Sequence, residues 1–166
     1  MLEVGMRVAY GIHGVCTITG REVRKVDRKN VEYFILEPID KPGAQFYVPA
    51  HNTVALSKLR TLLTLEELDA LFDSEETHRD CWIAEENRRK QYYRELLNGG
   101  ERAALISMIR VLYRHRESQL AAGKKFHMCD ETFLSDAQKM LVSEYSAVLE
   151  MPKPEIIAYI NGKIQK

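Results

Sequence analysis

The chain has 166 residues, of which 45% are apolar and 29% charged, and its 24 Lys and Arg residues balance its 24 Asp and Glu residues. This composition is that of a folded globular protein with one large or two small domains, and it argues against a disordered chain, a collagen-like chain or a membrane span. Three cysteines are too few, and odd in number, for a disulfide framework, and no apolar leader follows Met1, so we expect a reducing, cytoplasmic location.

Charge is unevenly distributed along the chain. Residues 1–60 carry nine basic and six acidic side chains, residues 61–78 carry six acidic and no basic ones, and residues 79–166 carry fifteen basic and twelve acidic ones. Within the last part, residues 79–128 have a local net charge of +5. Two mildly basic modules therefore flank an acidic joint, and the second has the sign expected of a phosphate-facing surface.

Residues 1–60 have the pattern of β-structure. Apolar side chains alternate from Val4 to Tyr10, which predicts a strand with one apolar face. Polar and Gly-Pro turns separate the apolar runs that follow. Further strands are expected at 15–24, 31–36, 45–49 and 53–56. Five short strands within about sixty residues favour a small SH3- or Tudor-like β-barrel.

Beyond residue 60 the apolar period changes from two to about 3.6, which indicates helices. Thr64 and Glu67 have the spacing of a capping box and predict a short helix within the acidic joint, residues 61–78. Longer helices are expected at 79–97, 101–121, 130–149 and 154–160. The predicted fold class is therefore α+β, with an N-terminal barrel followed by an all-α helical bundle over residues 79–166.

None of the common catalytic motifs occurs in the chain. A glycine-rich phosphate loop, a zinc-protease helix and a nucleophile elbow are all missing, so we expect no enzymatic activity, no cofactor and no small-molecule substrate. The strongest metal-site alternative is a zinc site made of His78, Cys81, His127 and Cys129. Because the second pair lacks the usual ligand spacing, we interpret these residues as solvated histidines and ordinary thiols, and we expect no bound metal.

The only tryptophan, Trp82, is expected at the beginning of a helix, where the residues that share its face are charged. Four basic residues lie near it in the sequence: Arg79, Arg88, Arg89 and Lys90. An aromatic ring beside basic groups is typical of a surface that holds a sugar-phosphate backbone. The alternative is a tryptophan that covers the bundle beside a solvated charged face, and Glu85 and Glu86 count against phosphate binding.

A resemblance to a known family adds to this interpretation. It rests on three groups of residues in register: Val4-Gly5, Val8, Tyr10 and His13-Gly14-Val15; then Glu32-Tyr33 and Leu36; then Val48-Pro49-Ala50 and Asn52. In these positions the chain resembles the CarD/CdnL family of bacterial transcription regulators. The first domain of that family is similar to the polymerase-interacting module of the transcription-repair coupling factor. The barrel, the acidic joint, the helical module and a tryptophan early in that module follow in the family's order.

The resemblance implies a barrel that docks on the β subunit of RNA polymerase. Arg24 falls at the family's basic polymerase contact, Val26 lies close to it, and Tyr47 replaces a second basic residue. The resemblance also implies a helical domain that contacts promoter DNA weakly in the minor groove, with little dependence on base sequence, at the upstream edge of the melted region, with Trp82 as the wedge. The expected function is a non-enzymatic regulator that biases promoter opening.

The alternative function is a protein-only adaptor, in which the barrel binds polymerase or a repair factor and the helical module binds another protein. The basic residues near Trp82 favour the regulator, and Glu85 and Glu86 favour the adaptor.

Overall fold

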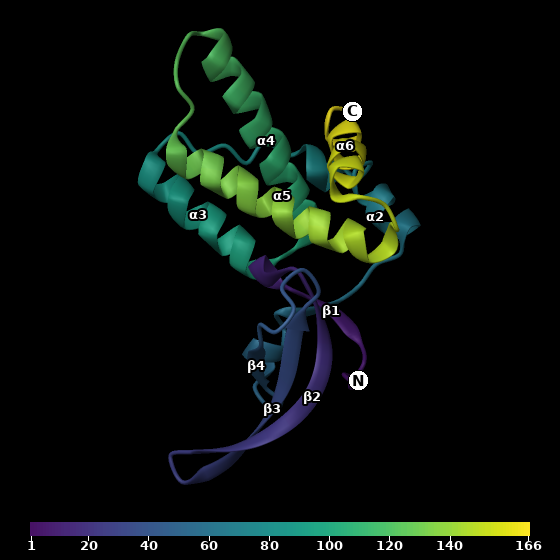
Figure 1. Ribbon diagram of the computed structural model, residues 1–166. Coiled ribbons are helices and arrows are strands. Elements are labelled where there is room, and N and C mark those ends of the chain that lie inside the picture. The colour runs from purple at the N-terminus through teal and green to yellow at the C-terminus, as the bar shows by residue number, and fades with distance from the viewer. The chain divides into compact units, whose positions relative to one another are not determined.

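The computed structural model describes all residues from Met1 to Lys166, and the chain divides into two compact units, Met1–Leu62 and Leu63–Lys166 (Figure 1). The first unit contains the strands β1 (Arg7–Tyr10), β2 (Val15–Val26), β3 (Lys29–Pro38), β4 (Phe46–Pro49) and β5 (Leu59–Thr61), with a 3-10 turn η1 (Gly11–His13) and a short helix α1 (Thr53–Leu56). The second unit contains α2 (Leu65–Leu71), a 3-10 turn η2 (Glu75–His78), α3 (Glu86–Gly99), α4 (Arg102–Ala121), α5 (Met128–Val148) and α6 (Lys153–Ile164). The predicted α+β class is confirmed.

The strands of the first unit form one antiparallel sheet with the order β4-β3-β2-β1-β5. A bulge between Ile18 and Gly20 bends the long β2–β3 hairpin. One face of the bent sheet encloses a small core that includes Ile18, Phe34, Leu36 and Val48. The ends of the sheet, β4 and β5, do not pair with each other.

Two details of this unit differ from the sequence prediction. The predicted strand at 53–56 is the helix α1, because the Asn52 side chain accepts a hydrogen bond from the Ala55 N–H at 3.0 Å and so caps a helical turn. The fifth strand follows at Leu59–Thr61. The first strand begins at Arg7 rather than Val4, and Val4 is exposed.

The β2–β3 hairpin continues beyond the rest of the sheet as a two-stranded arm, residues 23–32 (Figure 1). Its strands are joined by Asp27 and Arg28, which both have positive φ, of 47° and 65°. Positive φ at both central residues is the geometry of the tight hairpin turn that matches strand twist. The predicted turn at 27–30 is thus present as a two-residue loop.

The helices of the second unit, α2 to α6, pack around one shared hydrophobic core. Its largest fully buried side chains include Tyr93 from α3, Ile106 and Leu112 from α4, and Leu141 and Tyr145 from α5. The helix that was predicted from residue 79 begins at Glu86, because the Glu85 carboxylate accepts hydrogen bonds from the N–H groups of the first helical turn. Residues 79–85 are therefore not helical, which corrects the predicted position of Trp82.

From Leu63 onward, the acidic joint predicted at 61–78 is part of the helical unit, and its first two residues belong to the first unit. The capping box of Thr64 and Glu67 opens α2 as predicted, and Leu68 and Phe72 are buried in the helical core. Asp69, on the same helix, accepts hydrogen bonds from Tyr145 Oη at 2.8 Å and Tyr159 Oη at 2.5 Å. Lys163 Nζ lies 3.4 Å from the same carboxylate. One carboxylate thus joins α2, α5 and α6.

Replacing Asp69 with Asn is expected to lower the free energy of unfolding by about 1–2 kcal/mol at pH 7, because charge-assisted hydrogen bonds are lost. Burial alone would raise the pKa of Asp69, but the hydroxyls of Tyr159 and Tyr145 and the ammonium of Lys163 lower it below its ordinary value of 3.8. The carboxylate's contribution is therefore complete above about pH 4 and disappears as the pH falls through the folded pKa. Urea denaturation at pH 7 and pH 3, with the exposed Glu66→Gln as control, measures this; an equal deficit at both pH values contradicts it.

None of the helices combines the length and apolarity that a membrane span requires.

Candidate functional site

The three residues predicted to contact a polymerase lie on one face of the first unit's sheet. Residues paired across two strands share a face of the sheet, and Arg24 is paired with Val31 while Tyr47 is paired with Ile35. Val31 and Ile35 are four residues apart on β3, an even number, so their side chains point to the same face. Val26 is two residues after Arg24 and lies on the same face. This face, which we call the outer face, is the one opposite the core residues Phe34 and Val48.

Arg24 and Tyr47 are in direct contact on the outer face. The guanidinium carbon of Arg24 lies 3.7 Å from the centre of the Tyr47 ring. Arg24 Nε also donates to Glu22 Oε1 at 2.9 Å, and this hydrogen bond raises the pKa of Arg24. Tyr47 Oη in turn donates to Gln45 Oε1 at 3.0 Å. The aromatic residue that replaces a basic one in the family pattern is therefore combined with the remaining arginine into a single contact surface.

The sheet also offers unpaired backbone beside the outer face. β4 is an end strand of the sheet and has β3 as its only strand partner. β2 has a second open edge, on the side away from β3. Along that side it pairs with β1 only from Val15 to Thr17, and Ile18 forms backbone hydrogen bonds with the residues just before β1. The arm has no third strand, and Val23 and Val26 on it are exposed. Such edges allow a strand of another protein to pair with the sheet.

Trp82 lies in the irregular segment before α3 and is half-buried against the helical core. Its ring stacks on His115 of α4, with centroids 3.6 Å apart and planes inclined by 23°. Burial lowers the pKa of His115, so the imidazole is neutral at pH 7 and stacks without a charge. The Arg89 guanidinium lies 4.4 Å from the indole centroid. The indole is therefore held in place by Arg89 of α3 and His115 of α4.

Arg89 is buried rather than exposed, which corrects its predicted role as a phosphate contact. Its Nε and Nη2 donate to the two oxygens of Asp130 at 2.9 and 3.0 Å, and its Nη1 donates to the carbonyls of Ile83 and Ala84. Burial alone would lower the pKa of Arg89, but the hydrogen bonds and charge of Asp130 raise it. Arg89 thus fixes the segment that carries Trp82 and has no free edge for DNA.

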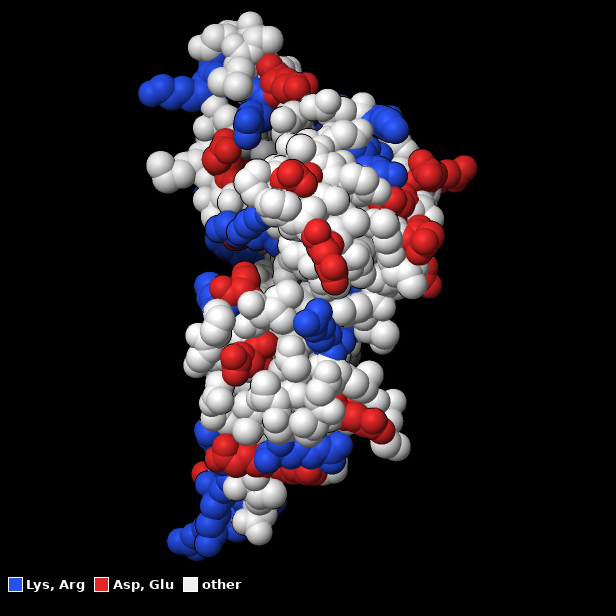
Figure 2. Space-filling model, turned by 45° about the vertical axis from the view of Figure 1, so that its right-hand side comes forward, with Lys and Arg blue, Asp and Glu red and all other residues white.

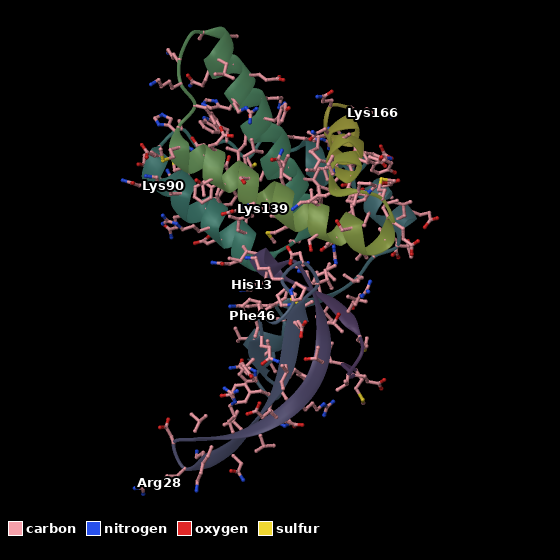
Figure 3. All side chains as sticks on the ribbon, viewed as in Figure 1. His13, Arg28, Phe46, Lys90, Lys139 and Lys166 are labelled. Carbon is pink, nitrogen blue, oxygen red and sulfur yellow. The ribbon has the colours of Figure 1, made fainter.

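The other predicted DNA contacts are near the surface. Arg79 and Arg88 are exposed, and Lys90 forms an ion pair with Glu86 at 2.6 Å (Lys90 is labelled in Figure 3). The carboxylate of Glu85, which counted against phosphate binding, accepts hydrogen bonds from the N–H groups of Asn87 and Arg88 in the first turn of α3. Figure 2 shows acidic and basic side chains interspersed on the face turned to the viewer, so no large area of one sign is present there.

No sequence pattern indicated that the connection between α4 and α5 lies beside Trp82. Phe126 lies beside His115, with ring centroids 6.3 Å apart, and His115 stacks on Trp82. Lys124 and Lys125, immediately before Phe126, are exposed. The last turns of α4 and this connection project from the rest of the helical unit (Figure 1). The aromatic series from Trp82 to Phe126, flanked by these lysines, defines what we call the Trp82 surface.

The structure does not assemble the zinc site considered above. No group of three or more His, Cys, Asp or Glu side chains in the chain is arranged to hold a metal ion. Cys81 accepts a long hydrogen bond from Ser107 Oγ at 3.8 Å, and Cys129 Sγ lies 4.0 Å from Glu86 Oε1. Both thiols are free.

Comparison with known proteins bears on the first unit. Residues 2–60 match the family model described as the CarD-like/TRCF RID domain, which covers all five strands except the last residue of β5. No curated protein matches the chain. Domains of this family are non-catalytic and interact with RNA polymerase. Residues 2–60 are therefore a CarD-like/TRCF RID domain, as the resemblance to the CarD/CdnL family implies, and a domain of this kind suggests a transcription regulator that binds RNA polymerase.

Proposed function

We propose that this protein binds the β subunit of RNA polymerase through residues 1–62 and contacts promoter DNA through the Trp82 surface, so that it biases the stability of the open complex. The observation that carries the proposal is the match of residues 2–60 to a CarD-like/TRCF RID domain. We place the protein in the cytoplasm, where RNA polymerase acts. The protein has no enzymatic role in this proposal.

The polymerase contact combines backbone pairing with side-chain specificity. A strand of the β subunit adds to the open edge of β4, where the backbone groups have no strand partner. Arg24, Val26 and Tyr47 on the outer face then select the partner, since a guanidinium stacked on an aromatic ring is already ordered before binding. Arginine and tyrosine are also the residue types most enriched among strongly contributing interface residues.

The DNA contact is weak on its own and strengthened by tethering. The Trp82 surface offers Lys124 and Lys125, and the exposed Arg79 and Arg88 are close to Trp82 in the sequence. Acidic residues such as Glu86 are also close to Trp82 in the sequence, so free DNA is bound weakly. Once the first unit is anchored on polymerase, the second unit meets promoter DNA at high effective concentration. Contacts to phosphates then suffice without sequence readout.

Trp82 prefers DNA that polymerase has already melted. Inserting an indole into an intact duplex costs a few kcal/mol of unstacking, and this cost is largely absent at an open fork. Only part of the Trp82 ring is exposed to solvent, and this exposed part would fill the minor groove beside the fork. Differential binding of the open state shifts the equilibrium toward it.

Replacing Trp82 with Ala is expected to shorten the lifetime of the open complex by about fivefold or more, the lower range of a coupling free energy. Binding to the β subunit should stay unchanged, because that contact lies in the other unit. Competitor challenge of preformed promoter complexes measures the lifetime. Ile157→Ala, an exposed apolar truncation on α6, serves as the matched control. An unchanged lifetime with Trp82→Ala, in a variant that circular dichroism shows to be folded, removes the wedge from the mechanism.

The second candidate function is the protein-only adaptor, in which the helical unit binds another protein instead of DNA. The ion pair of Lys90 with Glu86, which engages the charge that a phosphate would need, is the observation that favours the adaptor. Mobility shift of fork-containing promoter DNA in the presence of polymerase separates the functions. A salt-dependent further shift on adding this protein supports DNA contact, and its absence at all salt concentrations supports the adaptor.

A further inference from the structure

The helical unit contains an open pocket of about 280 Å³. It lies between η2, one face of α4 and the end of α6, and it is lined by His78, Arg110, Tyr113, Arg114, Glu117, Ile164, Gln165 and Lys166. Four of these residues are basic or can become so, and Glu117 is the one acidic residue among them. Lys166, at the end of α6, is labelled in Figure 3.

The floor of the pocket holds a buried cation without an acidic partner. Arg110 is 7% exposed. Its Nη2 donates to the carbonyl of Phe72 at 3.1 Å, and its Nη1 donates to Thr77 Oγ1 at 2.6 Å. It also donates to the backbone carbonyls of Thr77, Lys163 and Ile164, and its Nη1 lies 3.5 Å from His78 Nε2. Burial lowers the pKa of Arg110, and the charge of Asp73 offsets this effect only in part.

This arrangement leaves a positive charge that the protein compensates mainly with dipoles, because no carboxylate touches Arg110 and Asp73 acts on it only through its charge. The carbonyls of Phe72 and Ile164 lie at the C-terminal ends of α2 and α6, where the helix dipole is negative. Dipoles stabilise a buried cation less well than a full negative charge does. An anion entering the pocket therefore meets a strong attraction from Arg110, in surroundings that screen charge poorly.

A second arginine stands one helical turn further along α4. Arg114 is exposed, forms no ion pair, and shares the pocket face of α4 with Arg110, four residues before it. Its guanidinium is free to pivot onto a ligand and to offer two parallel N–H donors, the geometry that suits phosphate oxygens. Arg110 supplies fixed charge and Arg114 supplies mobile donors.

We propose that this pocket, the Arg110 pocket, binds a small phosphorylated molecule, whose phosphate accepts hydrogen bonds from Arg114 and is attracted by the fixed charge of Arg110. The half-buried ring of Tyr113 and the side chain of Ile164 provide an apolar wall for the rest of the ligand. The volume is close to the lower end of the range for small-molecule sites, which suits a ligand no larger than a mononucleotide. This site does not depend on the proposed polymerase-binding function.

The pocket favours a small ligand over the DNA of the proposed function. Arg110 lies at the bottom of a recess, whereas a duplex backbone reaches exposed side chains on a protruding surface. His115, which carries the Trp82 surface, follows Arg114 by one residue and so points about 100° away around α4. The two surfaces thus lie on different faces of the same helix.

Calorimetric titration of the full chain tests the proposal, with inorganic phosphate, pyrophosphate and AMP as probes, and with adenosine and sodium chloride at matched ionic strength as references. Saturable binding of the phosphate-bearing probes, and none of adenosine, is expected. Arg114→Glu is expected to weaken this binding by about tenfold or more, since it replaces a donor to the phosphate with a repelling charge. Lys139→Glu makes the same change of charge on an exposed residue of α5 outside the pocket, and should leave the affinity unchanged.

Three results would overturn the proposal. One is the absence of saturable binding for every phosphate-bearing probe. Another is an equal loss of affinity in Arg114→Glu and Lys139→Glu, which reports only the general charge of the unit. The third is an Arg114-dependent affinity for duplex DNA in the absence of any small-ligand binding, which assigns Arg114 to the nucleic-acid surface instead.

Discussion

Arg24→Glu is expected to weaken binding of the full chain to RNA polymerase by about 10- to 100-fold, the usual effect of losing an arginine that dominates an interface. The substitution removes the guanidinium that stacks on Tyr47 at 3.7 Å, and it places a second carboxylate next to Glu22 on the outer face. Both effects act on the same surface. Interferometry with immobilised core polymerase and the purified full-length variant measures the change.

Lys25→Glu is the matched control for this variant. Lys25 is the next residue of β2 and undergoes the same change of charge, but successive side chains of a strand point to opposite faces, so it lies away from Arg24 and Tyr47. We expect it to alter polymerase affinity by less than about threefold, through long-range charge alone. If both variants lose affinity equally, the outer face is not the binding surface; if neither does, the interface lies elsewhere on the first unit.

Asp130→Ala is expected to destabilise the helical unit by about 3–5 kcal/mol, because it leaves the buried guanidinium of Arg89 without its counter-charge. The side chains of this pair are 3% and 0% exposed, and two hydrogen bonds join them. Since Arg89 also holds the carbonyls of Ile83 and Ala84, loss of the pair should free the segment around Trp82. Urea denaturation followed by the fluorescence of the single tryptophan reports both effects.

The adjacent residue provides the control for this experiment. Glu131 forms an exposed ion pair with Arg116 at 3.2 Å, and exposed pairs contribute about 0–1 kcal/mol. The Glu131→Ala variant should therefore unfold at nearly the same urea concentration as the unchanged protein. Equal destabilisation by the two substitutions would mean that the Arg89–Asp130 pair is not a main source of stability. Replacing both partners by apolar residues of similar volume, as in Arg89→Met with Asp130→Leu, should recover much of the loss.

Most of the fold was accessible from local sequence patterns. The alternation of apolar residues in the first unit, and the capping box of Thr64 and Glu67, are signals that act within a few residues and that the structure confirms. The helix predicted to end near residue 97 ends at Gly99, and Gly100 after it has a φ of 63°. Short-range signals of this kind specify where elements begin and end, since the backbone groups at the ends need partners nearby.

The site was harder to predict, because it depends on contacts between distant parts of the chain. The basic residues near Trp82 were predicted to contact DNA from one exposed helix, whereas Arg89 is paired with Asp130, 41 residues later. The stacking of Trp82 on His115 and the proximity of Phe126 likewise join separate elements. Only Glu85, an acidic residue with the properties of a helix cap, carried a local signal that α3 begins after Trp82.

The arm of the first unit has a consequence for how copies of this protein behave toward one another. Between residues 23 and 32 it carries four basic and two acidic side chains, on a ribbon with two open edges. Net like charge keeps two such ribbons from aligning edge to edge, a common defence against aggregation in β-proteins. The charge of the arm thus discourages self-association, and high ionic strength weakens that protection.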